Sequence, residues 1–125
     1  MIVKPYVWLK TNPNIMNGQH FWLSSSELCV CAKKRNTIFN GNCEKSYSIS
    51  TAPQDRHHPN QKPLDIMQNL IMKSTNEGDT ILDPFAGSGT TGVACKNLAR
   101  NFILIEKEPE YIEIIKKRLE QQTLL

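Results

Sequence analysis

The stretch that decides the fold is Asp83–Gly92, which reads DPFAGSGTTG. A short apolar run, Thr80–Leu82, precedes it, and residues 93–98 follow it with helical spacing. This order predicts a strand, a tight glycine turn and a helix, which together form a ligand-binding corner of an α/β sheet. The glycines allow positive φ angles and a close approach of ligand to backbone. We expect Thr90 or Thr91 to cap the helix.

The residues of this turn narrow the class of ligand. A phosphate-binding loop needs a lysine after its last glycine, and none follows Gly89. Gly87, Gly89 and Gly92 satisfy the dinucleotide pattern Gly-x-Gly-x-x-Gly, which is weak by itself. Asp83 argues against a pyrophosphate, because a carboxylate at the strand end suits a cationic group such as an amino acid ammonium. A fragment of an NAD-type dehydrogenase is therefore a disfavoured alternative.

The combination Asp-Pro-Phe-x-Gly-Ser-Gly-Thr-Thr resembles the S-adenosylmethionine loop of the DNA amino-methyltransferases, which methylate exocyclic amines of DNA bases. A second stretch, His58–Pro63 (HPNQKP), resembles the segment of that family that covers the methionine end of the cofactor. Pro63 suits the first position of a helix, and an apolar stripe of helical period follows over residues 64–71. We expect this helix to end near Asn76–Gly78. Lys62 would then lie at a helix N-terminus, where we expect it to pair with a carboxylate.

A third stretch, Asn101–Glu106, is an apolar run that ends in a carboxylate 17 residues beyond Gly89. An acidic residue at the end of the second strand is placed to accept hydrogen bonds from two ribose hydroxyls. The resemblance implies the same role for Glu106. Pro109 opens a final helix, and we expect its basic run Lys116–Arg118 to form a solvated face.

Taken as a whole, the resemblance implies an α/β chain with a partial Rossmann-like methyltransferase fold, an open twisted sheet with flanking helices. It implies one partial domain over residues 1–125, with strands and a basic loop region in 1–56 and the cofactor-binding part in 57–125. The expected cofactor is S-adenosylmethionine. The residues expected to bind it are Asp83, Pro84, Phe85, Gly87, Ser88, Gly89, Thr90, Glu106 and Lys62.

The sequence of residues 1–56 predicts strands but offers few candidate functional residues. Residues 2–9 read as a strand, followed by a loop to about His20 with a turn at Asn17–Gly18. Glu27–Lys33 is apolar on both faces and is therefore predicted to be an interior strand. Two weak strands are expected at 37–39 and 47–49, around a turn at 40–42. The basic residues here either contact DNA phosphates or form a solvated loop: Lys33, Lys34, Arg35, Lys45 and Arg56.

Composition sets the remaining limits. The chain has 125 residues, of which 39% are hydrophobic and 22% charged, and its net charge of +3 permits contact with nucleic acid without arguing for it. No run of 18 apolar residues and no signal-peptide pattern is present, so we expect a cytosolic location and no membrane partner. The four cysteines are expected to be buried reduced thiols, and a zinc site is the lesser alternative, drawing on Cys29, Cys31, Cys43, His57 or His58.

One family feature is missing from the sequence. Amino-methyltransferases carry a catalytic loop, Asp/Asn/Ser-Pro-Pro-aromatic, that holds a flipped base. The candidates Lys4-Pro5-Tyr6, Asn12-Pro13-Asn14 and Asp83-Pro84-Phe85 lack the paired prolines, so no catalytic residue is assigned.

We therefore expect the C-terminal part of a beta-type enzyme that methylates adenine N6 or cytosine N4 in double-stranded DNA when complete. Two alternatives stay open. In the first, the chain would be a catalytically inactive remnant that binds the cofactor or DNA. In the second, it would be one half of a split enzyme whose partner polypeptide supplies the missing motif.

Overall fold

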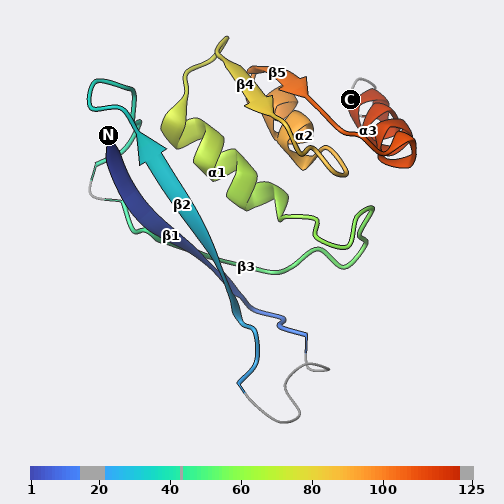
Figure 1. Cartoon of the computed structure of the whole chain (residues 1–125), viewed down its shortest axis with the longest axis horizontal. Helices are drawn as coiled ribbons and strands as arrows, with labels where there is room; N and C mark the ends of the chain where they lie inside the picture. The colour runs from blue at the N-terminus through green and yellow to red at the C-terminus, as the bar shows by residue number, and fades with distance from the viewer. Residues whose placement is uncertain (15–21, 43, 122–125) are drawn as a thin grey trace.

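The computed structural model describes residues 1–14, 22–42 and 44–121. Its elements in order are β1 (Ile2–Lys10), β2 (Ser26–Lys33), β3 (Tyr47–Ser50), α1 (Leu64–Ser74), β4 (Thr80–Asp83), α2 (Thr90–Asn97), β5 (Asn101–Leu104) and α3 (Pro109–Gln121). β1 pairs antiparallel with β2 and parallel with β3, whereas β4 pairs parallel with β5 in a separate sheet. α1 lies between the three-stranded sheet and α2 (Figure 1). The predicted turn at Asn17–Gly18 lies outside the described residues.

The first core cluster joins the three-stranded sheet to α1. Alternation along β1 places Tyr6 and Trp8 on one face of the sheet, where both are buried with Ala52 and Ile66. The indole Nε1 of Trp8 donates a hydrogen bond to the carbonyl oxygen of Ser50 at 3.1 Å. The polar end of the buried Trp8 ring is thereby paired, and the ring is held in one orientation.

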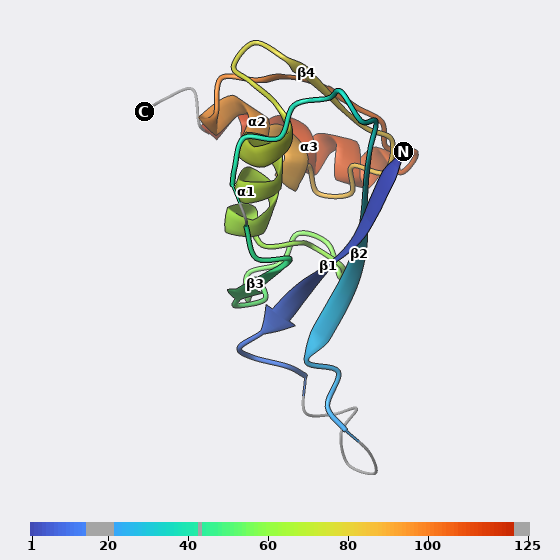
Figure 2. The ribbon, with the colours of Figure 1, turned by 90° about the vertical axis from the view of Figure 1, so that its left-hand side faces the viewer.

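The second core cluster joins α1 to α2 and to the smaller sheet. Ile71, Ala94 and Cys95 are buried at the contact of the two helices, and half-buried Ile81 and Phe102 pack against them. Burial raises the pKa of the Cys95 thiol. The β4–turn–α2 order is the one predicted around Asp83–Gly92, and β5 lies within the strand predicted over 101–106. α1 connects this part to the rest of the chain (Figure 2).

The prediction that residues 27–33 form an interior strand is wrong, because β2 is an edge strand of its sheet. Leu28 and Val30 are 77% and 75% exposed. The register pairs Val7 with Leu28 and Leu9 with Ile49, so these side chains share the sheet face that is turned away from α1. We call this apolar surface the open face, formed by Val3, Leu9, Leu28, Val30 and Ile49.

Two other sequence predictions need correction: the pair of strands around the turn at 40–42, and the residue at which α1 ends. Residues 37–39 form no strand, and β3 pairs parallel with β1 instead of closing a hairpin. The backbone N–H of Asn40 instead donates to the Lys73 carbonyl at 2.7 Å, and its side-chain amide donates to the carbonyls of Met72 and Thr75. These bonds satisfy orphan carbonyls at the end of α1, which ends at Ser74 rather than near 76–78.

The cysteine prediction is confirmed at one position and wrong at two. Cys95 is buried and free, but Cys29 and Cys31 are exposed on β2, and Cys43 lies outside the described residues. Among the residues that the structure describes, no group of three His, Cys, Asp or Glu side chains is arranged to hold a metal ion. None of the described helices has the length and apolar character that a membrane span requires.

Candidate functional site

A cavity of about 640 Å³ lies at the carboxyl ends of β4 and β5, which is where ligands bind in open α/β sheets. Most of its lining comes from three segments: the HPNQKP stretch before α1, the glycine turn with the start of α2, and the residues after β5. Eight of the nine residues predicted for the cofactor line it, namely Lys62, Asp83, Pro84, Phe85, Gly87, Ser88, Thr90 and Glu106.

The ninth residue, Gly89, does not line the cavity but packs closely against α3. It is the N-cap of α2 and has a φ of +79°, in the left-handed region that glycine favours. A Cβ at this position would lie 2.8 Å from Cγ1 of Ile115 in α3. Gly87 also has positive φ, as predicted. The prediction of a threonine cap is wrong, because Thr90 and Thr91 lie inside α2 and no side chain caps its start.

Asp83 is the last residue of β4, and hydrogen bonds fix its carboxylate. Oδ1 accepts from the backbone N–H of Phe85 at 3.0 Å, and Oδ2 accepts from the hydroxyl of Thr91 at 2.6 Å. Each carboxylate oxygen has a second lone pair, so Asp83 still has acceptor capacity for a ligand in the cavity. The role of Thr91 was not predicted, although the Thr-Thr pair of the motif contains it.

Glu106 lies two residues beyond β5, and its carboxylate accepts three backbone hydrogen bonds. Oε2 accepts from Gly87 N at 2.8 Å, and Oε1 accepts from Lys107 N at 2.8 Å and Glu108 N at 3.0 Å. The N–H of Glu108 is the largest cause that lowers the pKa of Glu106, aided by the other two N–H groups and by His58, while desolvation opposes them. The carboxylate is thereby kept ionised and tied to the glycine turn.

The lowered pKa of Glu106 predicts a pH-dependent contribution to stability. Because the pKa is lower in the folded chain than in the unfolded one, ionised Glu106 stabilises the fold above the unfolded value of about 4.3, and this is lost as the pH falls through the folded pKa. The difference in unfolding free energy between wild type and Glu106→Gln should persist from about pH 8 to 5 and shrink below about pH 4. Urea unfolding across pH measures it; a constant difference down to pH 3 would contradict the assignment.

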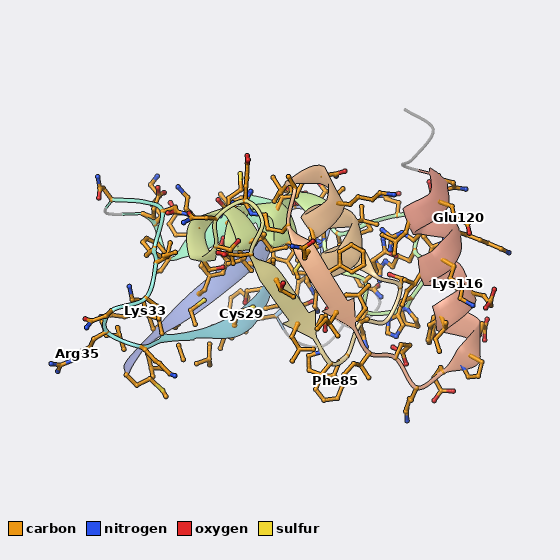
Figure 3. The ribbon with its side chains drawn as sticks, turned by 90° about the horizontal axis from the view of Figure 1, so that it is seen from above. Cys29, Lys33, Arg35, Phe85, Lys116 and Glu120 are labelled. Atoms are coloured by element: carbon orange, nitrogen blue, oxygen red, sulfur yellow. The ribbon has the colours of Figure 1, made fainter. Side chains whose placement is uncertain are left out.

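An aromatic wall of the cavity was not predicted from the sequence. The rings of His58 and Tyr111 have centroids 4.5 Å apart and an interplanar angle of 52°. Nδ1 of His58 accepts a hydrogen bond from Asn60 N at 3.0 Å. Both rings line the cavity beside the glycine turn, and a Cβ on Gly87 would lie 3.5 Å from Cδ2 of His58. Phe85, which projects from the turn after β4, is 88% exposed (Figure 3).

Arg118 contradicts the prediction of a purely solvated basic run in α3. Its guanidinium donates to the carbonyl oxygen of Ser88 at 2.6 Å and to the Ser88 hydroxyl at 3.0 Å. The hydroxyl of Ser88 in turn hydrogen-bonds to Oε1 of Gln61 at 3.1 Å. Burial lowers the pKa of Arg118. α3 and the HPNQKP stretch are therefore both tied to the buried serine of the turn.

These features define a class of protein. Two neighbouring parallel strands each lead to a fixed carboxylate, and a glycine turn between them starts a helix, as in the nucleoside-binding corner of Rossmann-like enzymes. A family model described as DNA methylase (N6_N4_Mtase) matches residues 4–117, so the chain belongs to this DNA methylase family.

Curated relatives and solved structures agree with this family. The chain is 36% identical over 139 residues to the type II methyltransferase M2.DpnII of Streptococcus pneumoniae, covering 97% of the chain and 52% of that protein. It is 37% identical to M2.LlaDCHI of Lactococcus lactis subsp. cremoris, covering 94% and 51%. The M1.HpyAVI–SAM complex superposes with a TM-score of 0.79 and 41% identity over 94% of the chain and 62% of that structure.

A more distant structure supports the fold alone. The cytosine-N4-specific PvuII DNA methyltransferase matches with a TM-score of 0.76 but 16% identity, over 92% of the chain and half of that structure. The predicted family and the partial Rossmann-like fold are confirmed. The chain spans about half the length of these two curated relatives.

Proposed function

We propose that the chain is the S-adenosylmethionine-binding part of a DNA methyltransferase that acts, when complete, on adenine N6 or cytosine N4. The observation that carries the proposal is the pair of fixed carboxylates, Asp83 and Glu106, on either side of one glycine turn in one cavity. A cytosolic location belongs to the same proposal.

The donors and acceptors of the cavity fit the cofactor. Asp83 would accept from the ammonium group of the methionine moiety, and Lys62 would meet its carboxylate. Glu106, with its pKa lowered, would accept from the ribose hydroxyls. The adenine would lie among apolar and aromatic side chains, which include Phe85, Ile105 and Tyr111. When bound, the cofactor supplies a sulfonium methyl group for direct transfer to an amine.

The charge of the cavity favours this cofactor over a dinucleotide. Three carboxylates line it, on Asp83, Glu106 and Glu108, against two ammonium groups, on Lys62 and Lys107, for a net charge of −1 (2 − 3). A pyrophosphate would add negative charge next to an excess of negative charge. A sulfonium nucleoside with a zwitterionic amino acid end places a positive centre in the same surroundings.

Double-stranded DNA is the proposed substrate, and Lys34 and Arg35 are the proposed phosphate contacts. Both are exposed in the loop after β2. Arg35 lies at the end of the molecule opposite α3 (Figure 3). Other basic residues of the region serve local structure: Lys33 Nζ donates to the Thr37 carbonyl at 2.9 Å, and the Arg56 guanidinium donates to the carbonyls of Pro53 and Pro59. Phosphate contacts of this kind give affinity that falls with salt.

A polypeptide partner is proposed for the catalytic step. The lining of the cavity supplies no Pro-Pro-aromatic sequence to hold a target amine, and the relatives are about twice as long as the matched region. The open face offers apolar side chains that mixed and parallel sheets normally bury. We propose that a segment equivalent to the unmatched half of the relatives covers this face and brings the catalytic motif.

The test separates binding from methyl transfer. Calorimetry on the 125-residue chain should show one site for S-adenosylmethionine, while labelled methyl transfer to mixed-sequence DNA should be absent or weak. Co-expression with the catalytic half of a relative should restore transfer and bury the open face, measured by hydrogen exchange at β2. Robust transfer by the chain alone would contradict the need for a partner, and absence of cofactor binding would favour a non-binding remnant.

A further inference from the structure

Three charged side chains form a cluster beside the cavity, and only one of them lines it. Glu27 on β2 lies between two lysines: Oε1 pairs with Lys10 Nζ at 2.8 Å, and Oε2 pairs with Lys62 Nζ. Lys62 lines the cavity, whereas Lys10 and Glu27 do not. The cluster therefore connects the three-stranded sheet to the side chain that we expect to meet the carboxylate of the cofactor.

A buried aromatic ring supports the same two lysines. The Nζ atoms of Lys10 and Lys62 lie 5.1 and 5.9 Å from the ring centroid of Trp8. Trp8 is only 4% exposed, and its indole N–H is bonded to Ser50. Both ammonium groups therefore share a fixed cation–π surface as well as one carboxylate.

The cluster of Lys10, Glu27 and Lys62 has a net positive charge. Two ammonium groups and one carboxylate sum to +1 (2 − 1), next to a cavity that is otherwise acidic. Desolvation raises the pKa of Glu27, but hydrogen bonds and charge from Lys10 and Lys62 outweigh it, so the pKa is lowered. Glu27 is therefore an anion that neutralises one lysine and leaves the charge of the other available.

We propose that Glu27 is a positioning residue for cofactor binding, which fixes the Lys62 ammonium so that it meets the α-carboxylate of an amino acid bound through its nucleoside. Without the carboxylate, the two ammonium groups would repel each other, and Lys62, whose side chain is 46% exposed against 19% for Lys10, would move into solvent. This inference rests on the proposed function.

The experiment uses two ligands that differ only in the amino acid part. S-adenosylhomocysteine carries the amino acid, and 5′-methylthioadenosine lacks it; neither carries a sulfonium. Glu27→Gln should weaken S-adenosylhomocysteine binding by about threefold to tenfold and leave 5′-methylthioadenosine unchanged, measured by calorimetry. Lys62→Met should give the same selective loss, and Glu27→Gln should add nothing in the Lys62→Met chain.

A matched control is available elsewhere in the chain. Glu44 pairs with Lys73 at 2.6 Å outside the cavity, so Glu44→Gln removes the carboxylate of a similar ion pair and should change neither affinity. Three results would overturn the role of Glu27 without touching the proposed function. These are an equal loss of affinity for both ligands, unchanged or tighter binding of S-adenosylhomocysteine by Glu27→Gln, and an effect of Glu27→Gln that persists in the Lys62→Met chain. A wild-type chain that binds neither ligand would overturn the proposed function and this inference with it.

Discussion

Asp83→Asn is expected to lower the affinity for S-adenosylmethionine by about tenfold to a hundredfold. The substitution removes the charge that we propose faces the ammonium group of the cofactor. It also places an amide N–H₂ against one of two donors, the Phe85 N–H or the Thr91 hydroxyl. A hydrogen bond to a charged group contributes about 1.5–3 kcal/mol, which corresponds to this range. Calorimetric titration of both chains measures the change directly.

Asp79→Asn is the matched control for this prediction. Asp79 directly precedes β4, at the end of the strand remote from the cavity, and its Oδ2 accepts from Asn76 N at 2.8 Å. The control substitution should leave cofactor affinity unchanged even if it lowers the melting temperature. Unchanged affinity in Asp83→Asn, with the chain folded, would show that the cationic end of the cofactor does not lie at Asp83.

The corner formed by β4, the glycine turn and α2 was predictable because its information is local. Asp83, Gly87 and Gly89 lie within seven residues of one another, and both glycines have the positive φ angles that the tight turn requires. The position of Glu106 at the cavity was predictable because the lengths of the helix and strand that follow the turn fix its distance from the turn. The partners of these residues were less predictable: the motif gave no reason to expect three backbone N–H groups around Glu106.

The contacts that join distant segments could not be predicted from periodicity. Glu27 and Lys62 are separated by 35 positions, and Arg118 and Ser88 by 30. Nothing in the spacing of charges distinguishes such a pair from two solvated side chains. The same limit explains the error on β2, because an apolar run shows that both faces can be buried but not whether a neighbouring strand or helix is present to cover them.

Gly89→Ala is expected to destabilise the chain by about 2–5 kcal/mol, the largest stability effect of a single methyl group that we predict. Two costs add. A non-glycine residue at a φ of +79° pays about 1–2 kcal/mol of backbone strain, and the added Cβ would lie 2.8 Å from Ile115 Cγ1, an overpacking that costs about 1–3 kcal/mol. Ile115 is buried, so the clash must displace α3 rather than one free side chain.

Gly78→Ala separates these two costs. Gly78 has a φ of +83°, nearly that of Gly89, but a Cβ there would meet no heavy atom within 4 Å. Gly78→Ala should therefore cost only the strain of about 1–2 kcal/mol, and urea unfolding of both variants measures the difference. A displaced α3 would also move Tyr111 and Arg118 away from the turn, so Gly89→Ala should weaken cofactor binding while Gly78→Ala should not. Equal losses of stability in the two variants would show that α3 yields to the added methyl group without cost.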